Sequence, residues 1–126
     1  MKLYTVITIC YMLLITFLSH IPQKDISEYA SSGPDNIDLL FHFVEYSILG
    51  FLLLRTFTSG ELRTFHPFYA SLLIGISFAI LDEFHQSFVP GRHMSSADMI
   101  FDSLGILFGT FLCSRTVSFL PNNLPY

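Results

Sequence analysis

Charged side chains are scarce in this 126-residue chain, because Lys, Arg, Asp and Glu together make up only 13% of it. An average soluble domain carries roughly 25% charged residues, and at this length a soluble fold leaves much of its surface in water. With 52% hydrophobic residues, the chain has too little charge to cover that surface. The composition therefore excludes a disordered chain and argues against a soluble globule.

Basic residues and cysteine are also scarce. The chain has 6 Lys and Arg residues against 10 Asp and Glu, a formal net charge of −4, which offers no basic surface to nucleic acid. Cys10 and Cys113 lie far apart in apolar runs, so their spacing matches neither a disulfide framework nor a zinc site. A glycine-rich phosphate loop is missing too. We therefore expect no cofactor, no fixed metal motif and no nucleic-acid partner.

Four apolar segments remain as the main feature of the chain. They cover about residues 3–19, 37–54, 67–86 and 97–120. About 20 mostly apolar residues cross the hydrocarbon core of a bilayer as a helix. We therefore expect an all-α fold, with residues 1–126 forming one membrane domain built as a bundle of four transmembrane helices. Lys2 before an apolar run also suits a signal peptide, but no small-x-small cleavage site follows, so we expect the first helix to be retained.

The distribution of Lys and Arg predicts the orientation. In a bundle of four helices, the side that holds both termini carries four basic residues: Lys2, Arg55, Arg63 and Arg115. The other side carries only Lys24 and Arg92. Because Lys and Arg are enriched in cytoplasmic loops, we expect a multi-pass protein with both termini in the cytoplasm.

Polar residues in and beside the apolar segments all fall near one end of this bundle, where the second and fourth helices begin and the third ends. We predict that they line a ligand-binding pocket, which the expected orientation makes outward-facing: Asp38, His42, Tyr46, Asp82, Glu83, Gln86, Arg92, Asp98 and Asp102. An Asp at mid-membrane costs about 2.5–3.5 kcal/mol on insertion scales, and less near the interface. Such a cluster therefore usually marks a site.

Helical spacing supports the same prediction. Asp38, His42 and Tyr46 are spaced by four residues, which places them on one helix face. Gly105 and Gly109 form a GxxxG element, in which two helix backbones can approach closely. With Gly75, which lies in a stripe of small residues on the third helix, these glycines are expected to pack the helices tightly in the other half of the bundle.

Some of the polar residues have simpler explanations. Asp38 and Asp98 lie near helix starts, where a carboxylate caps the helix or stabilises its dipole. His42 also suits a satisfied interhelical hydrogen bond, and Arg92 suits a solvated turn. Capping does not explain Asp82, because an acidic group near the end of a helix opposes the dipole.

Three motifs in the chain resemble the VanZ-like membrane protein family. They are Asp38-x-x-x-His42-Phe43-x-x-Tyr46, then Asp82-Glu83-x-His85-Gln86-x-Phe88-Val89-Pro90-Gly91-Arg92, then Asp98-x-x-x-Asp102-x-x-Gly105-x-x-x-Gly109. Leu39 and Asp102 depart from the family, which commonly has Lys and Asn there. The resemblance implies an integral membrane protein of the bacterial envelope, in the cytoplasmic membrane. The family's namesake is associated with resistance to the glycopeptide antibiotic teicoplanin.

Two functions compete on these observations. The first is binding of a cell-wall precursor, a lipid head group or a glycopeptide antibiotic, with Arg92 holding a phosphate or carboxylate. The alternative is an intramembrane hydrolase or transferase acting on an envelope lipid, in which His42, Glu83, His85 and the aspartates bind a metal or act as general base. A small transporter ranks last, because four helices are few for a pathway. Membrane lipids and a second copy of the chain are further expected partners.

Overall fold

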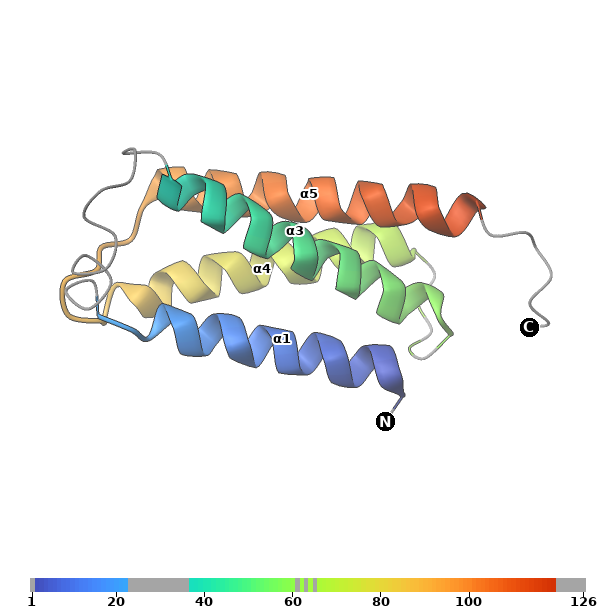
Figure 1. Ribbon diagram of the computed structural model, residues 1–126, viewed down its shortest axis with the longest axis horizontal. Coiled ribbons are helices and arrows are strands. Elements are labelled where there is room, and N and C mark those ends of the chain that lie inside the picture. Colours follow the sequence, from blue (N-terminus) through green and yellow to red (C-terminus); the bar gives the residue numbers. More distant parts are fainter. Residues whose placement is uncertain (1, 23–36, 61, 63, 65, 120–126) are drawn as a thin grey trace.

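The computed structural model describes residues 2–22, 37–60, 62, 64 and 66–119, with the side chains of 118 and 119 left out. Four α-helices alternate in direction along the chain (Figure 1): α1 (Leu3–Ser19), α3 (Ile37–Thr58), α4 (Pro67–Gln86) and α5 (Ser96–Phe119). The described residues contain no strand. This confirms the all-α bundle of four helices expected from the sequence.

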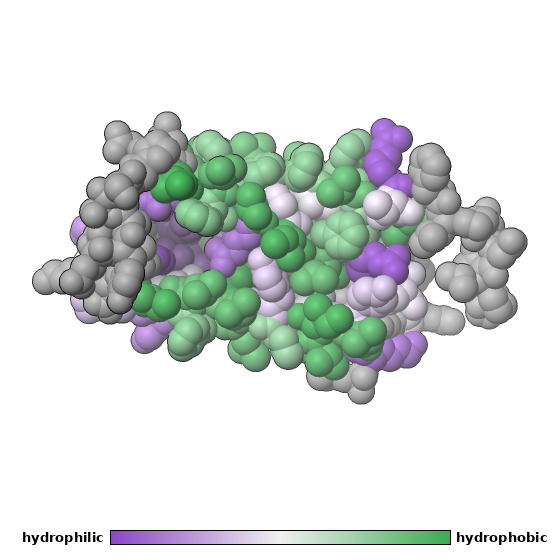
Figure 2. Space-filling model, viewed as in Figure 1, coloured by the Kyte–Doolittle hydropathy of each residue, from purple (hydrophilic) through white to green (hydrophobic). Residues whose placement is uncertain are grey.

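Most of the helical length is suited to a membrane. α3, α4 and Ser96–Val117 within α5 are each long and apolar enough to cross a bilayer, whereas α1 is a shorter apolar helix of 17 residues. At 1.5 Å per residue α1 spans about 26 Å, slightly less than the roughly 30 Å of hydrocarbon. Large apolar side chains cover the outside of the bundle (Figure 2). This surface is suited to lipid contact, and the chain is a membrane protein.

The helix α3 is one turn longer than the sequence predicts, since it ends at Thr58 rather than near Leu54. Arg55, which marked the expected end, stays within the helix because its charge finds a partner on α1. Its Nη2 donates a hydrogen bond to the Tyr4 hydroxyl at 2.8 Å, and its guanidinium carbon lies 4.8 Å from the centre of the Tyr4 ring. Long basic side chains near helix ends commonly reach polar surroundings in this way.

The closest packing in the bundle is between α3 and α5. A Cβ added to Gly105 would lie 2.5 Å from the main-chain oxygen of Phe43, and one added to Gly109 would collide with the main-chain oxygen of Ser47. Gly50 on α3 meets the backbone of α5 in the same way. Only glycine allows two helix backbones to come this close.

The core of the bundle is formed around Ile106, whose side chain is fully buried with those of Tyr46 and Leu49. Gly75 on α4 faces this side chain, and a Cβ there would lie 2.6 Å from the Ile106 Cδ1 atom. The obstacle at Gly75 is therefore the end of a flexible side chain, and not a backbone atom as at Gly109.

The helix α1 packs on α3 and α4 and is attached to them by polar groups along its length. The hydroxyls of Thr8 and Thr56 are hydrogen-bonded at 2.9 Å, and the Tyr11 hydroxyl donates to the main-chain oxygen of Glu45 at 3.1 Å. Interhelical hydrogen bonds in membrane proteins contribute about 0.6 kcal/mol each on average. Several such bonds hold this shorter helix in place.

The alternating directions bring one end of each helix together. α3 and α5 begin, and α1 and α4 end, at one end of the bundle, on the left in Figure 1, while α1 begins and α5 ends at the other. The predicted site residues within helices lie in the first two turns of α3 and α5 and in the last two turns of α4. Tyr46 is the exception, because it lies deeper in the bundle.

Candidate functional site

Polar residues from all four helices meet at the end of the bundle where α3 and α5 begin. Hydrophilic surface is visible inside a recess near this end, between green apolar side chains (Figure 2). The polar residues form two separate groups. Successive residues of a helix point about 100° apart, so Asp82 and Glu83, although adjacent on α4, belong to different groups.

The first group, here called the Asp82 network, consists of Asp82, Ser19, Tyr46 and Gln86. The Asp82 Oδ2 atom accepts hydrogen bonds from the Ser19 hydroxyl at 2.6 Å, the Tyr46 hydroxyl at 3.1 Å and the Gln86 amide at 3.1 Å. The Gln86 amide also donates to Ser19 Oγ at 3.1 Å. All four residues are buried. The network therefore ties α1, α3 and α4 together.

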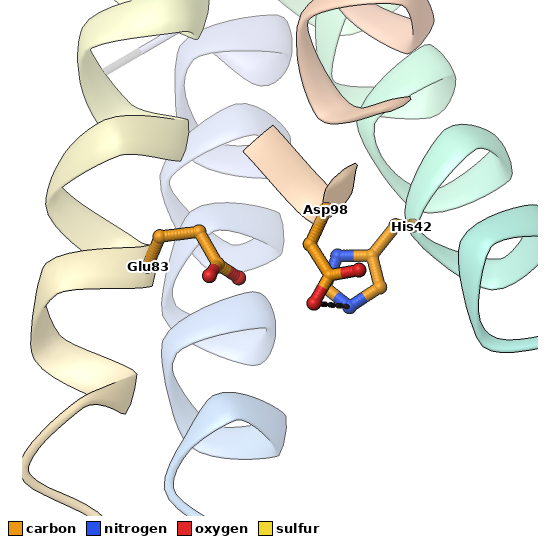
Figure 3. Close-up of side chains that lie close together, drawn as sticks. All are labelled: His42, Glu83 and Asp98. Carbon is orange, nitrogen blue, oxygen red and sulfur yellow. Dashed lines mark ion pairs between the residues drawn. The ribbon is translucent and has the colours of Figure 1, made fainter. Parts of the chain in front are cut away.

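The second group, here called the His42 cluster, consists of His42, Glu83, Asp98 and Asp102. His42 Nδ1 lies 2.9 Å from Asp102 Oδ1, and His42 Nε2 lies 3.9 Å from Asp98 Oδ2. Figure 3 shows Glu83, Asp98 and His42 converging from α4, α5 and α3. One ligand-type atom from each of these three residues lies within 4.8 Å of the others.

The contact with Asp102 orients the imidazole ring of His42. A carboxylate accepts hydrogen bonds but does not donate them, so beside an ionised Asp102 the proton of a neutral imidazole is placed on Nδ1. The Nε2 atom then presents its lone pair toward Asp98. This is the arrangement in which a carboxylate fixes the tautomer of a histidine that binds a ligand through its other nitrogen.

Three buried polar atoms at the site have no hydrogen-bond partner in the described part of the chain: Glu83 Oε1, Asp102 Oδ2 and Arg92 Nε. The other oxygen of Glu83 accepts a hydrogen bond from the main-chain N–H of Ser95 at 3.1 Å. An unsatisfied buried polar group costs about 1–3 kcal/mol, and a charged one costs more. Unsatisfied atoms gathered at one place suggest that a ligand completes the site.

A pocket of about 740 Å³ lies beside both groups. Among the predicted site residues, five line it: Asp38, His42, Gln86, Arg92 and Asp98. The other four are fully or almost fully buried and are not among the lining residues: Tyr46, Asp82, Glu83 and Asp102. The structure thus separates the predicted residues that line the pocket from those buried behind its wall.

Several lining residues were not predicted from the sequence. α1 contributes Tyr11 and Ser19, and the turn before α5 contributes His93 and Ser95. Glu45 also lines the pocket, and its seven-residue spacing from Asp38 on one helix face was the available signal. No pattern within the first apolar segment indicated that it forms a wall of the pocket.

Two predicted residues lie at the margin of the site. Asp38 is exposed in the first turn of α3, at the edge of the pocket. His85, considered above as a metal ligand, lies apart from the His42 cluster and stacks on His20, with ring centroids 5.3 Å apart. The packing glycines Gly75, Gly105 and Gly109 are buried at the helix contacts described above.

Comparison with known proteins gave one match. The family model described as VanZ/LLP1 matches residues 4–119, almost the whole chain. This confirms the resemblance inferred from the three motifs. No curated protein and no solved structure matches the chain.

Proposed function

The chain belongs to the VanZ/LLP1 family, and we propose that it binds the anionic head group of an amphiphilic envelope lipid in the pocket beside the His42 cluster. The observation that carries this proposal is the two-sided lining of the pocket. Polar side chains from all four helices form one part of the lining, and apolar side chains on the outer surface of α1 and α3 form the other.

The apolar part of the lining is suited to a lipid tail. Leu18, Phe41 and Ile48 line the pocket, yet they are 41%, 65% and 45% exposed on the outside of the bundle. A lipid whose head group enters the pocket could therefore keep its hydrocarbon chain against α1 and α3. The volume of 740 Å³ falls within the roughly 300–1,000 Å³ of small-molecule sites.

The polar part of the lining selects the head group through Arg92. It is the one Arg or Lys residue among those that line the pocket in the described part of the chain, and its Nε atom has no hydrogen-bond partner there. A guanidinium group binds phosphate or carboxylate through paired hydrogen bonds. Glu45 and Asp98 on the same lining offer acceptors for hydroxyl or amino groups, so we propose a phosphorylated lipid such as a cell-wall precursor.

We further propose that this end of the bundle faces outward from the bacterial cytoplasmic membrane, with both termini in the cytoplasm. The excess of Lys and Arg on the side of the termini supports this orientation. Because the namesake of the family is associated with teicoplanin resistance, we also propose that this pocket contributes to teicoplanin tolerance. We expect a bacterial host that expresses the wild type to be less susceptible to teicoplanin than one expressing Arg92→Ala at equal membrane levels.

The direct test is lipid binding by the purified protein. Native mass spectrometry of the detergent-solubilised chain with phosphatidylglycerol is expected to show binding that is about 10- to 100-fold weaker for Arg92→Ala, because a charge-assisted hydrogen bond contributes about 1.5–3 kcal/mol. Arg92→Lys should lose less, since it keeps the charge without the planar fork. Arg115→Ala is the matched control, because Arg115 is exposed on the last part of α5 and contacts Phe111. Equal binding by wild type and Arg92→Ala would contradict the proposal.

A second candidate, an intramembrane hydrolase or transferase, is favoured by one observation. The contact with Asp102 orients His42 in the lining of the pocket, where the imidazole can take part in proton transfer to or from a bound substrate. Such an enzyme would use water to cleave phosphate or head group from the bound lipid, and His42→Ala would abolish this hydrolysis while Arg92 still contacts the head group. Unchanged lipid after prolonged incubation with wild type would exclude this candidate for the lipid tested.

A further inference from the structure

We infer that His42, Glu83 and Asp98 form a binding site for one divalent transition-metal ion, Zn²⁺ or Mn²⁺, and that Asp102 is a positioning residue for His42. The site lies near the surface of the bundle end, because His42 is in the second turn of α3 and Asp98 in the first turn of α5. The inference stands on the geometry of these side chains and does not depend on the identity of the lipid.

The distances agree with a shared ion. Two ligands that each lie about 2.0–2.2 Å from one metal ion are separated from one another by roughly 3–4 Å. His42 Nε2 and Asp98 Oδ2 are 3.9 Å apart, too far for a hydrogen bond and close to the separation that a shared ion requires. Candidate ligand atoms of all three residues lie within 4.8 Å of one another, so a small side-chain rotation completes the site.

The burial of Glu83 is an independent indication of a ligand. Its side chain has 0% exposure, its Oε1 atom has no hydrogen-bond partner in the described part of the chain, and its carboxyl group points toward Asp98 and His42 (Figure 3). A buried charge without a partner is strongly unfavourable. A cation held between these three side chains would remove that penalty, which the hydrogen bond from Ser95 to the other oxygen does not do.

The contact between Asp102 and His42 follows the pattern of metal-binding histidines. Such a histidine usually donates its second ring N–H to a carboxylate or carbonyl group, which fixes the tautomer and the ring orientation. Asp102 is fully buried and lies 2.9 Å from Nδ1, while Nε2 is directed to the proposed ion. The imidazole ligand favours Zn²⁺ over Mg²⁺, the two carboxylates also suit Mn²⁺, and three protein ligands leave at least one coordination position open.

The ion would also reduce the negative charge of the site for the proposed lipid. Glu83, Asp98 and Asp102 carry three formal negative charges when ionised, and a phosphate bound at Arg92 would approach this acidic cluster. A divalent cation leaves one net negative charge and offers its open position to a phosphate oxygen. This step, unlike the metal site itself, depends on the proposed function.

Metal binding is measured on the purified full-length chain in detergent without added lipid. After treatment with a chelator, the protein is titrated with Mn²⁺, and free Mn²⁺ is followed by electron paramagnetic resonance. We expect one ion per chain for the wild type. Affinity should fall at least 100-fold for Asp98→Asn and Glu83→Gln, and about 10- to 100-fold for Asp102→Asn. His66→Ala is the matched control, since His66 is an exposed histidine before α4, at the opposite end of the bundle, and its affinity should equal that of the wild type.

A second measurement takes its main result from the wild type, so that result does not depend on how a variant folds. The electron spin echo of Mn²⁺ bound to wild type should show coupling to one imidazole ¹⁴N, which should disappear when His42→Ala is loaded with the same ion. Absence of a stoichiometric ion, absence of the nitrogen coupling, or an equal loss in His66→Ala would overturn the metal site. Because lipid is absent from these experiments, their failure would leave the test of Arg92 valid, and a failure of lipid binding would leave the metal result valid.

Discussion

Replacing Asp82 by Ala should destabilise the bundle rather than remove a ligand contact. Asp82 joins Ser19 on α1 and Tyr46 on α3 to α4 through hydrogen bonds of 2.6 and 3.1 Å. Although the residue lies in the motif shared with the family, its polar atoms face the inside of the bundle. The two interhelical bonds are therefore expected to determine the effect of the substitution.

The magnitude follows from these bonds. Interhelical hydrogen bonds in membrane proteins contribute about 0.6 kcal/mol on average and at most about 1.7 kcal/mol, so losing two lowers the free energy of unfolding by about 1–3 kcal/mol. Loss of the bond from Gln86 on the same helix adds about 1 kcal/mol. Asp82→Asn keeps one oxygen in place and should lose less, and Tyr46→Phe should lose a single bond.

Reversible unfolding by steric trapping or by denaturing detergent in bicelles measures these differences. A double-mutant cycle of Tyr46→Phe and Asp82→Ala isolates the energy of their contact, expected at about 0.6–1.7 kcal/mol. Asp38→Ala is the control, because Asp38 is an exposed acid at the same end of the bundle and should change stability by less than about 0.5 kcal/mol. A stability of Asp82→Ala equal to that of the control, or a coupling of zero, would refute the reasoning.

Further predictions concern packing and topology. Gly109→Ala should destabilise the bundle by about 1–3 kcal/mol in the same unfolding assay, and more than Gly75→Ala, because the first meets backbone and the second meets the side chain of Ile106. Ile106→Val should partly restore Gly75→Ala and not Gly109→Ala; equal rescue of both would contradict the packing. In intact cells a membrane-impermeant maleimide should label His93→Cys and not Ser59→Cys in a cysteine-free background, since both residues are exposed but at opposite ends of the bundle; the reverse pattern would show that the termini are outside.

The fold follows from the sequence because each helix is encoded by a local apolar run. The predicted helix boundaries were accurate where polar turn residues follow the apolar run directly, as at Gln86, the last residue of α4. They were wrong where a charged residue is accommodated by another helix, since α3 continues past Arg55 through its contact with Tyr4. That contact joins residues 51 positions apart, and no local pattern reveals it.

The candidate site was predictable only in part. The position of a residue along its helix determines its depth in the bundle, but it does not reveal which residues of the other helices the side chain meets. The sequence places Asp82 and Glu83 at the same end of the bundle and on different sides of one helix, but it does not reveal which residues of the other helices each one meets. The absence of a fixed metal-ligand spacing was also uninformative, because His42, Glu83 and Asp98 come from three different helices. Their proximity depends on the register of α3 against α5, which the glycine contacts determine.

The separation of the two groups changes how a loss of function should be interpreted. The Asp82 network holds α1 through Ser19, and α1 supplies Tyr11, Leu18 and Ser19 to the lining of the pocket. A variant of Asp82 would therefore weaken lipid binding by displacing this wall, even though the residue does not line the pocket. Tyr46→Phe weakens the same network without removing a charge, so it should reproduce the loss in milder form. A substitution in the His42 cluster should instead weaken lipid binding while α1 stays in place. Hydrogen exchange of the α1 backbone would distinguish this case from a variant of the Asp82 network.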